Sequence, residues 1–370
     1  MTARRQDSLF GLEREEKIVE SGVRNVFTPH QPVNDVDLFF GRQDEVHSII
    51  EQINTPGQHS LLYGERGVVK SSLANISSKL LLSKIIDGNL YLKICDSEST
   101  FISILREPLA EIGIDVSIEQ VDETNTSGGG GKVRVSGENE TACSRVGPRQ
   151  RVSPSFAADK LQSVSGLLVV DEADSLATDE DRHKLAEFVK QLSDRGSDFK
   201  VLIVGIAQTG DELTAGHKSV KRCLRETKLG RMSKDELKEI LQNGETELGL
   251  DFSKTVKKKI IKASSGYPHF THLLALKCAE NAISEDREKI KQIHFEKALR
   301  EAREDAEGTL SRSYKTATRS HKTEMYEVVL KAAARLGGQE FTAADLRNEI
   351  QEITGEEITQ KSPNNYFKRL

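Results

Sequence analysis

Apolar residues follow two different spacings along the chain, and the change falls near residue 230. Before it, short apolar runs typical of buried strands alternate with stretches of helical spacing. One helical stretch follows Arg42, with Val46, Ile49, Ile50 and Ile53 on one face, and another covers 71–82. The predicted strands cover 59–63, 89–94, 167–170 and 201–206. Short apolar strands that alternate with helices are typical of a parallel sheet covered on both faces. The spacing therefore predicts an α/β core over residues 41–231.

Beyond Leu229 the apolar positions follow helical spacing alone. Ser233 and Glu236 form a capping box, in which each side chain satisfies a backbone amide at the start of a helix. Further helices are predicted at 253–264, 268–284, 293–304 and 325–336, then from Thr342 and from Ser362. We expect one helical segment over 232–305 and, after a polar linker, a second one over 306–370.

Two stretches fit neither spacing. Residues 1–40 are largely polar and end on the apolar patch 36–40, so we interpret them as a leader. Residues 122–156 contain four consecutive glycines and many Ser, Thr and Asn, and they cannot bury enough apolar surface to become ordered. We expect a flexible insertion. Its basic residues form either a solvated loop or a contact with nucleic-acid phosphates: Lys132, Arg134, Arg145, Arg149 and Arg151.

Composition narrows the classes of protein. The 370 residues carry a net charge of −5, so any contact with nucleic acid has to be local. No apolar run reaches the roughly 18 residues that a membrane span requires. The four cysteines lie far apart, which indicates a reducing, cytoplasmic location. Eight histidines show no spacing typical of metal ligands, and we expect them to be surface or structural residues: His30, His47, His59, His183, His217, His272, His294 and His321.

The strongest motif is the glycine-containing run from Gly64 to Ser71, which lies between a predicted strand and a predicted helix, as a P-loop does. Such a loop directs backbone N–H groups and a helix N-terminus at phosphate oxygens. Lys70 is then expected to bridge the β- and γ-phosphates of ATP, Ser71 to ligate Mg²⁺ and Ser72 to donate to the α-phosphate. The loop residues expected to surround the phosphates are Gly64, Glu65, Arg66, Gly67, Val68 and Val69.

Val69 departs from the motif, which has glycine immediately before the lysine. Glycine lets the backbone approach the phosphates without a Cβ atom, whereas a β-branched side chain is bulky and stiff. Our hypothesis is that Val69 weakens nucleotide binding or distorts the geometry at the γ-phosphate.

Two carboxylates end the apolar strand at 167–170, about one hundred residues after the loop. Asp171 is expected to hold the Mg²⁺ shell, and Glu172 to polarise the attacking water as a general base. A strand that merely ends in a solvated acidic turn is the alternative.

Four motifs together resemble the origin-recognition/initiator branch of AAA+ ATPases, over roughly residues 36–305. They are Phe40-Gly41-Arg42, the P-loop, the run 170–174 and the run 205–213, and the lid adds Gly266-Tyr267-Pro268-His269. The resemblance implies a P-loop NTPase (AAA+) parallel sheet with a helical lid, followed by a winged-helix-like helical segment. Gly266-Tyr267-Pro268 also resembles the Gly-x-Pro element of STAND signalling NTPases, so both branches stay open.

The resemblance also implies roles for residues outside the P-loop. Gln208 matches the polar sensor of the γ-phosphate, which is usually asparagine in the family. Arg222, with Arg225 as second candidate, matches the arginine finger that one subunit lends to its neighbour's ATP. His269 matches the second sensor, usually arginine, and a shorter, partly charged side chain there puts tight γ-phosphate sensing in doubt.

The last helices resemble the helical half of a winged-helix domain, whose third helix enters the major groove of DNA. In the helix expected from Ser362, the outward residues suit contacts with phosphates and bases: Lys361, Asn364, Asn365, Lys368 and Arg369. A small helical module that binds protein is the alternative.

Three functions follow from these features. The first is an ATP-driven switch that assembles into oligomers, or with a partner ATPase subunit, and acts on duplex DNA or a partner protein. The second is a nucleotide-binding scaffold without hydrolysis, which Val69 and His269 motivate. The third is a STAND-type signalling or defence module. We expect no contact with a membrane.

Overall fold

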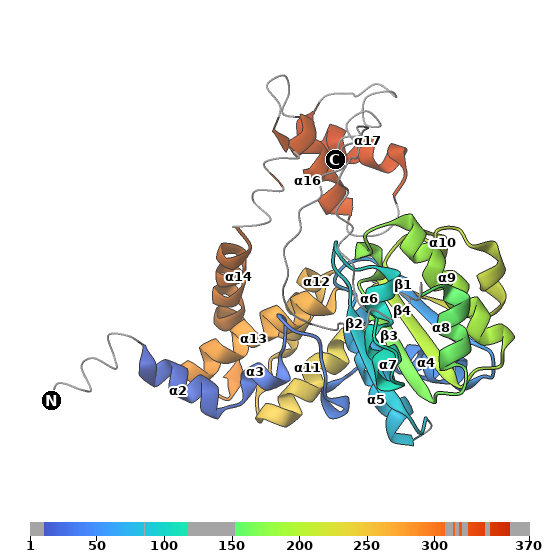
Figure 1. The fold of residues 1–370 in the computed structure, drawn as a ribbon. Helices are drawn as coiled ribbons and strands as arrows, with labels where there is room; N and C mark the ends of the chain where they lie inside the picture. Colours follow the sequence, from blue (N-terminus) through green and yellow to red (C-terminus); the bar gives the residue numbers. More distant parts are fainter. Residues whose placement is uncertain are drawn as a thin grey trace, which may run out of the picture. The chain divides into compact units, whose positions relative to one another are not determined.

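The computed structural model describes residues 11–84, 86–116, 152–307, 314, 318–319, 325–336 and 341–355. They form two compact units, drawn in Figure 1. The α/β unit comprises Asp44–Arg66 and Leu73–Leu229, as far as these are described. The helical unit comprises the described parts of Met1–Gln43, Gly67–Ser72 and Gly230–Leu370.

A five-stranded parallel sheet forms the centre of the α/β unit. Its strands lie in the order β2-β3-β4-β1-β5, and their bounds are β1 His59–Gly64, β2 Asn89–Ile94, β3 Gly166–Asp171, β4 Phe199–Ile206 and β5 Leu224–Leu229. The four strands predicted from apolar runs are confirmed. The edge strand β5 was not among them, because its exposed positions carry charged side chains.

Helices cover both faces of this sheet (Figure 1). Alternate residues of β3, Leu168 and Val170, belong to the same buried cluster as Phe188 of the long helix α9. On the other face, Ser60 of β1 donates a 2.7 Å hydrogen bond to Gln52. Apart from Gln43 and the first turn of α5, which belong to the helical unit, the described α-helices of this unit are α4 Gln43–Asn54, α5 Lys70–Lys84, α6 Phe101–Ile104, α7 Arg106–Glu111, α8 Pro154–Leu161, α9 Asp179–Asp194 and α10 Gly210–Leu213.

The helical unit packs four helices around a second core. They are α11 Lys234–Leu248, α12 Lys254–Ser264, α13 Pro268–Ser284 and α14 Gln292–Glu307, with a short strand pair, β6 Asp251–Phe252 and β7 Lys289–Ile290. The capping box that starts α11 is confirmed. The Ser233 amide donates to the Glu236 carboxylate at 2.7 Å, and the Glu236 amide donates to the Ser233 hydroxyl at 3.2 Å.

Part of the predicted leader, residues 1–40, is helical and belongs to this second core. Its helices are α2 Leu12–Glu20 and α3 Val23–Val26. Ile18, Val23 and Phe27 are buried in the same cluster as apolar residues of α11 and α13. Phe27 lies directly on the backbone of α11, since a Cβ atom added at Gly244 would meet its ring at 2.1 Å. The described part of the leader therefore stabilises the helical unit.

The predicted insertion, 122–156, extends too far toward the C-terminus, because its last residues start a helix. Most of it, including its five basic residues, lies outside the described residues. Helix α8 nevertheless begins at Pro154, and the Ser153 hydroxyl caps it by accepting from the Phe156 amide at 3.2 Å. Ser-Pro is a strong start signal for a helix, so the assignment of 153–156 to the insertion was wrong.

Two of the three predicted C-terminal helices are described. These are α16 Met325–Leu336 and α17 Ala343–Thr354, which bury Val329, Ala332, Leu346 and Ile350 between them. The helix expected from Ser362 lies outside the described residues. Among the residues that are described, no helix is both long and apolar enough to cross a membrane.

Candidate functional site

The predicted phosphate loop connects the end of β1 to the start of α5. A Cβ atom at Gly64 would lie 2.3 Å from the Leu229 carbonyl oxygen of β5, so this position admits only glycine. Gly67 has φ +85°, a left-handed backbone that glycine adopts without strain. Glu65 and Arg66 between them are exposed. Both glycines of the motif are therefore required by the path of the backbone.

Val69 adopts a left-handed backbone, with φ 63°. This is the region that glycine favours and that a β-branched residue enters only with strain, at a cost of about 1–2 kcal/mol per residue. Val68 beside it is fully buried, and the half-buried Val69 side chain packs against the core of the helical unit. The loop thus keeps a glycine-like backbone in spite of the substitution.

Lys70, Ser71 and Ser72 form the first turn of α5. The first N–H groups of a helix have no acceptor within it, and they form a positive end suited to an anion. Lys70 is buried with 9% of its surface exposed, and Ser71 is half-buried. The buried Ser72 hydroxyl accepts a 3.0 Å hydrogen bond from the amide of Val33. This contact with the N-terminal segment was not visible in the sequence, and it leaves the Ser72 hydroxyl proton to donate elsewhere.

The acidic pair lies at the end of β3. Asp171 is buried, and its Oδ1 accepts from the Glu172 amide at 2.8 Å. Glu172 is exposed and has φ 54°, a second strained, non-glycine backbone of the kind that clusters at functional sites. Just beyond, Asp174 accepts from the Ile206 amide at 2.8 Å and so ties the end of β3 to the end of β4.

The sheet brings these strand ends to one edge. Because β3, β4 and β1 are parallel neighbours, their carboxyl ends lie side by side. The exposed Gln208 follows β4 by two residues, and its backbone N–H donates to the Glu212 carboxylate at 3.2 Å. Asp171, Glu172 and Gln208 therefore share the edge at which β1 ends in Gly64.

The two arginine-finger candidates lie at the other end of the sheet. Arg222 ends the short helix η3, Lys218–Arg222, which leads into β5, and Arg225 is exposed on β5. Strand β5 is parallel to β1, with Leu224 beside His59 and Leu229 beside Gly64. Arg222 is 67% exposed and forms an ion pair with Asp194 of α9. About 20 Å of strand separates it from the edge that carries Gly64.

His269, the predicted second sensor, is half-buried and holds the N-terminal segment. Its Nδ1 donates to the Pro29 carbonyl at 2.7 Å. One turn later, His272 accepts at Nδ1 from the Thr28 amide at 3.2 Å. Burial, together with the nearby charge of His269, lowers the pKa of His272 to about 4. The spacing of His269 and His272 places them on the same face of α13, but it does not reveal that both bind the backbone of residues 28 and 29.

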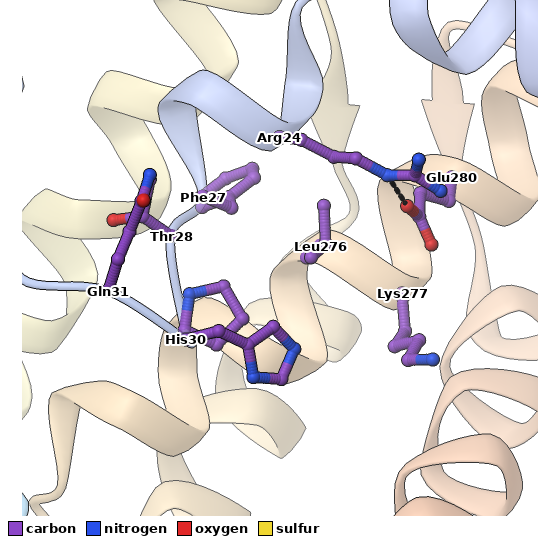
Figure 2. A pocket seen from close by; sticks show the side chains of 9 residues that line it. Arg24, Phe27, Thr28, His30, Gln31, Leu276, Lys277 and Glu280 are labelled. Atoms are coloured by element: carbon purple, nitrogen blue, oxygen red, sulfur yellow. Dashed lines mark hydrogen bonds and ion pairs between the residues drawn. The ribbon is translucent and has the colours of Figure 1, made fainter.

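A cavity of about 410 Å³ lies between residues 24–31 and α13. Figure 2 shows Arg24 reaching the carboxylate of Glu280, with Phe27, His30 and Leu276 around the opening. The Arg24 Nε donates to Glu280 at 2.7 Å. The ion pair and the two histidine contacts together fasten residues 24–29 to α13.

Three metal-ligating side chains of the α/β unit lie close together in space, although the spacing of the histidines along the sequence predicts no metal set. His183, Glu187 and His217 each place a ligand atom within 4.8 Å of the others. The chain separates His217 from the other two by a strand and a helix, so spacing along the sequence could not reveal the group.

The sheet order, the glycine-dependent loop after β1 and the acidic end of β3 together define a P-loop NTPase with the AAA+ fold. The chain belongs to the Novel STAND NTPase 1 family, whose family model matches residues 28–357. The AAA+ features and the STAND-like Gly-x-Pro element thus occur in one chain. No curated protein sequence matches it.

Solved structures share this fold at low identity. The Aeropyrum pernix ORC1 protein, solved in complex with DNA, is 16% identical with a TM-score of 0.52, over 94% of this chain and 86% of that one. The Walker-type ATPase paby2304 of Pyrococcus abyssi is 16% identical with a TM-score of 0.55, over 93% and 92%. The Aeropyrum pernix ORC2 protein, in ADPNP-ADP complexes, is 15% identical with a TM-score of 0.54, over 94% and 87%.

Proposed function

We propose that this protein binds ATP with Mg²⁺ and hydrolyses it as a molecular switch. The observation that carries the proposal is the backbone of the loop from Gly64 to Ser71, which keeps its left-handed turn even where Val69 makes that turn costly. A loop without a ligand to cradle would gain nothing from this strain. Lys70 then contacts the β- and γ-phosphates.

The residues present suit Mg²⁺, which prefers oxygen ligands. Ser71 supplies a hydroxyl and Asp171 a buried carboxylate, whose orientation is held by the Glu172 amide. When bound, the ion neutralises charge on the phosphate oxygens. Glu172 polarises the attacking water, and Gln208 contacts either that water or the γ-phosphate.

The switch is proposed to work between subunits. Arg222 is exposed at the sheet end opposite Gly64, which is out of reach of its own loop and suited to a neighbour's. A second copy, or a partner ATPase subunit, would receive this cation on its ATP. The resulting assembly would engage duplex DNA or a partner protein through the C-terminal segment. The ORC1 structure, which contains DNA, supports the first of these outputs.

Phosphate release from ATP, with and without duplex DNA, tests the proposal. We expect turnover in the native chain, loss of both binding and turnover in Lys70→Ala, and binding without turnover in Glu172→Gln. Stimulation by DNA would support the DNA output. If the native chain releases phosphate no faster than the two variants, the hydrolysis proposal fails and a nucleotide-binding scaffold replaces it.

A STAND-type signalling module is the second candidate, supported by the family match and by Gly266-Tyr267-Pro268. In it the C-terminal segment binds protein rather than DNA. A gel-shift series at increasing salt separates the two. Affinity for duplex DNA that falls steeply with salt is expected for phosphate contacts, whereas no shift at low salt favours the signalling module.

A further inference from the structure

Helix α9 and the loop before η3 bring three metal-ligating side chains together. His183 and Glu187 lie one helical turn apart, with His183 Nε2 3.7 Å from Glu187 Oε1. The ring of His217 lies beside that of His183, with centroids 4.7 Å apart. One ligand atom from each of the three lies within 4.8 Å of the other two. All three belong to the α/β unit.

His217 gives the second observation. Its Nδ1 is buried and has no hydrogen-bond partner among the described residues. A buried polar nitrogen without a partner destabilises the fold, so such a group in a native protein calls for a water or a metal ion as its partner. A surface pair of His and Glu one helical turn apart is common in proteins. A second histidine beside such a pair, with a buried nitrogen that has no hydrogen-bond partner, is uncommon.

Small rotations would close the cluster around an ion. Ligand atoms of a tetrahedral zinc site lie roughly 3.3 Å apart, given bonds of about 2.0 Å. The side chains of His183 and Glu187 are 47% and 45% exposed, so both have room to turn. The backbone amide of His217 is bonded to the Thr214 carbonyl at 3.1 Å, which fixes where the third ligand begins.

We propose that His183, Glu187 and His217 bind a first-row transition-metal ion of the Zn²⁺ type, with the remaining position open to water. Two imidazoles and one carboxylate suit Zn²⁺, Co²⁺ and Ni²⁺, whereas Mg²⁺ prefers oxygen ligands alone. This site is separate in residues and in metal preference from the Mg²⁺ ligands Ser71 and Asp171. It also does not depend on whether the protein hydrolyses ATP.

Co²⁺ titration of the chelator-treated full chain, without nucleotide, tests the proposal. Co²⁺ replaces Zn²⁺ in such sites and gives visible absorption bands that report nitrogen ligands. We expect the bands to saturate at one equivalent, to disappear when Zn²⁺ is added, and to survive an excess of Mg²⁺. Zn²⁺ should also raise the Tm, because an ion that binds only the folded state stabilises it.

His217→Ala and Glu187→Gln are the diagnostic variants, and His47→Ala is their matched control, since His47 is an exposed helix histidine of α4 outside the cluster. Loss of an outer-shell partner weakens a metal site by roughly 10- to 100-fold, so loss of a ligand should weaken Co²⁺ binding by at least about 10-fold. Glu187 is half exposed, so its variant tests the site even if His217→Ala fails to fold. Native chain without the bands, or Glu187→Gln with native affinity, would overturn the proposal.

Discussion

Val69 shows how one side chain can change a site without changing its backbone. Its φ of 63° matches the conformation that the motif's glycine permits. The loop backbone therefore follows the path that a glycine would take, and the difference that remains is the Cβ atom beside the expected phosphates. Affinity for ATP, rather than the shape of the loop, is the property that the valine should affect.

We expect Val69→Gly to bind ATP about 10-fold more tightly, equivalent to about 1.4 kcal/mol, because the backbone can then approach the phosphates. Val69→Ala is the matched control, since alanine keeps a Cβ atom at the same backbone angle, and it should bind like the native chain. Titration with a fluorescent ATP analogue measures both. Equal affinities for the glycine variant and the native chain would contradict the steric explanation.

Single residues were predictable where the motif itself requires them. The roles of Gly64 and Gly67 followed from the spacing, and the structure gives the physical reason for each. The acceptor role of Ser72 and the bond from His269 to Pro29 were not predictable, because both partners lie in a segment with no motif. Every residue type has a backbone N–H or C=O group, so the amino-acid sequence does not show which residue makes a long-range contact through its backbone.

The packing of α3 and Phe27 on α11 depends on a missing side chain. Gly244 lies inside α11, where glycine is otherwise unfavourable, and its absent Cβ makes room for the Phe27 ring. We expect Gly244→Ala to lower the free energy of unfolding by about 1–3 kcal/mol through overpacking, although alanine is the better helix former. Urea denaturation measures the change.

Gly230→Ala is the control for this substitution, because a Cβ atom there meets nothing within 4 Å. It should leave the free energy of unfolding within about 0.5 kcal/mol of the native value. If Gly244→Ala proves as stable as Gly230→Ala, the contact between Phe27 and α11 does not hold the N-terminal helices.

Helices and strands were predictable where apolar spacing or a capping signal was strong. The strands β1 to β4 and the capped helix α11 lie where apolar runs or a capping box predict them. The edge strand β5 and helices α2 and α3 did not, because each buries too few side chains to show a clear period. Tertiary packing rather than local pattern decides such elements.

A buried, neutral histidine occurs in each of the two units, His59 in the α/β unit and His272 in the helical unit, and this links the stability of the chain to pH. Burial is the main cause that lowers the pKa of His59 to about 3 and of His272 to about 4, from an ordinary value near 6.5. Both accept a backbone hydrogen bond at Nδ1, which requires the neutral ring. As the pH falls below 6.5, the unfolded chain takes up these protons first, so the stability present above pH 6.5 is lost toward pH 4.

We expect the free energy of unfolding to fall by about 2 kcal/mol per histidine between pH 7 and pH 5. Urea denaturation at both values measures the difference. His272→Gln should remove about half of the pH dependence that the two rings cause, whereas His47→Gln, a change at an exposed position, should remove none. An unchanged dependence in His272→Gln would show that this ring is not neutral in the folded state.

Subunit mixing tests the place of Arg222. Lys70→Ala keeps the arginine but lacks a working loop, and Arg222→Ala keeps the loop but lacks the arginine. We expect each variant alone to be inactive in phosphate release and their mixture to recover activity. In a mixed assembly, Arg222 of a Lys70→Ala subunit can reach ATP bound to the intact loop of an Arg222→Ala subunit. Arg225→Ala serves as comparison. A mixture as inactive as its components would argue against a finger supplied by a neighbour.

The helical unit is assembled from three separate stretches of chain, and this affects its biosynthesis. The amide of Val33 reaches Ser72 in the first turn of α5, while the core that Val69 contacts comes from residues after 230. A ribosome has therefore translated more than half of the chain before the phosphate loop can acquire the neighbours in this unit that come from residues after 230. A nascent chain stalled before that point would carry the complete loop sequence and yet lack its support, so ATP capture should begin late in translation.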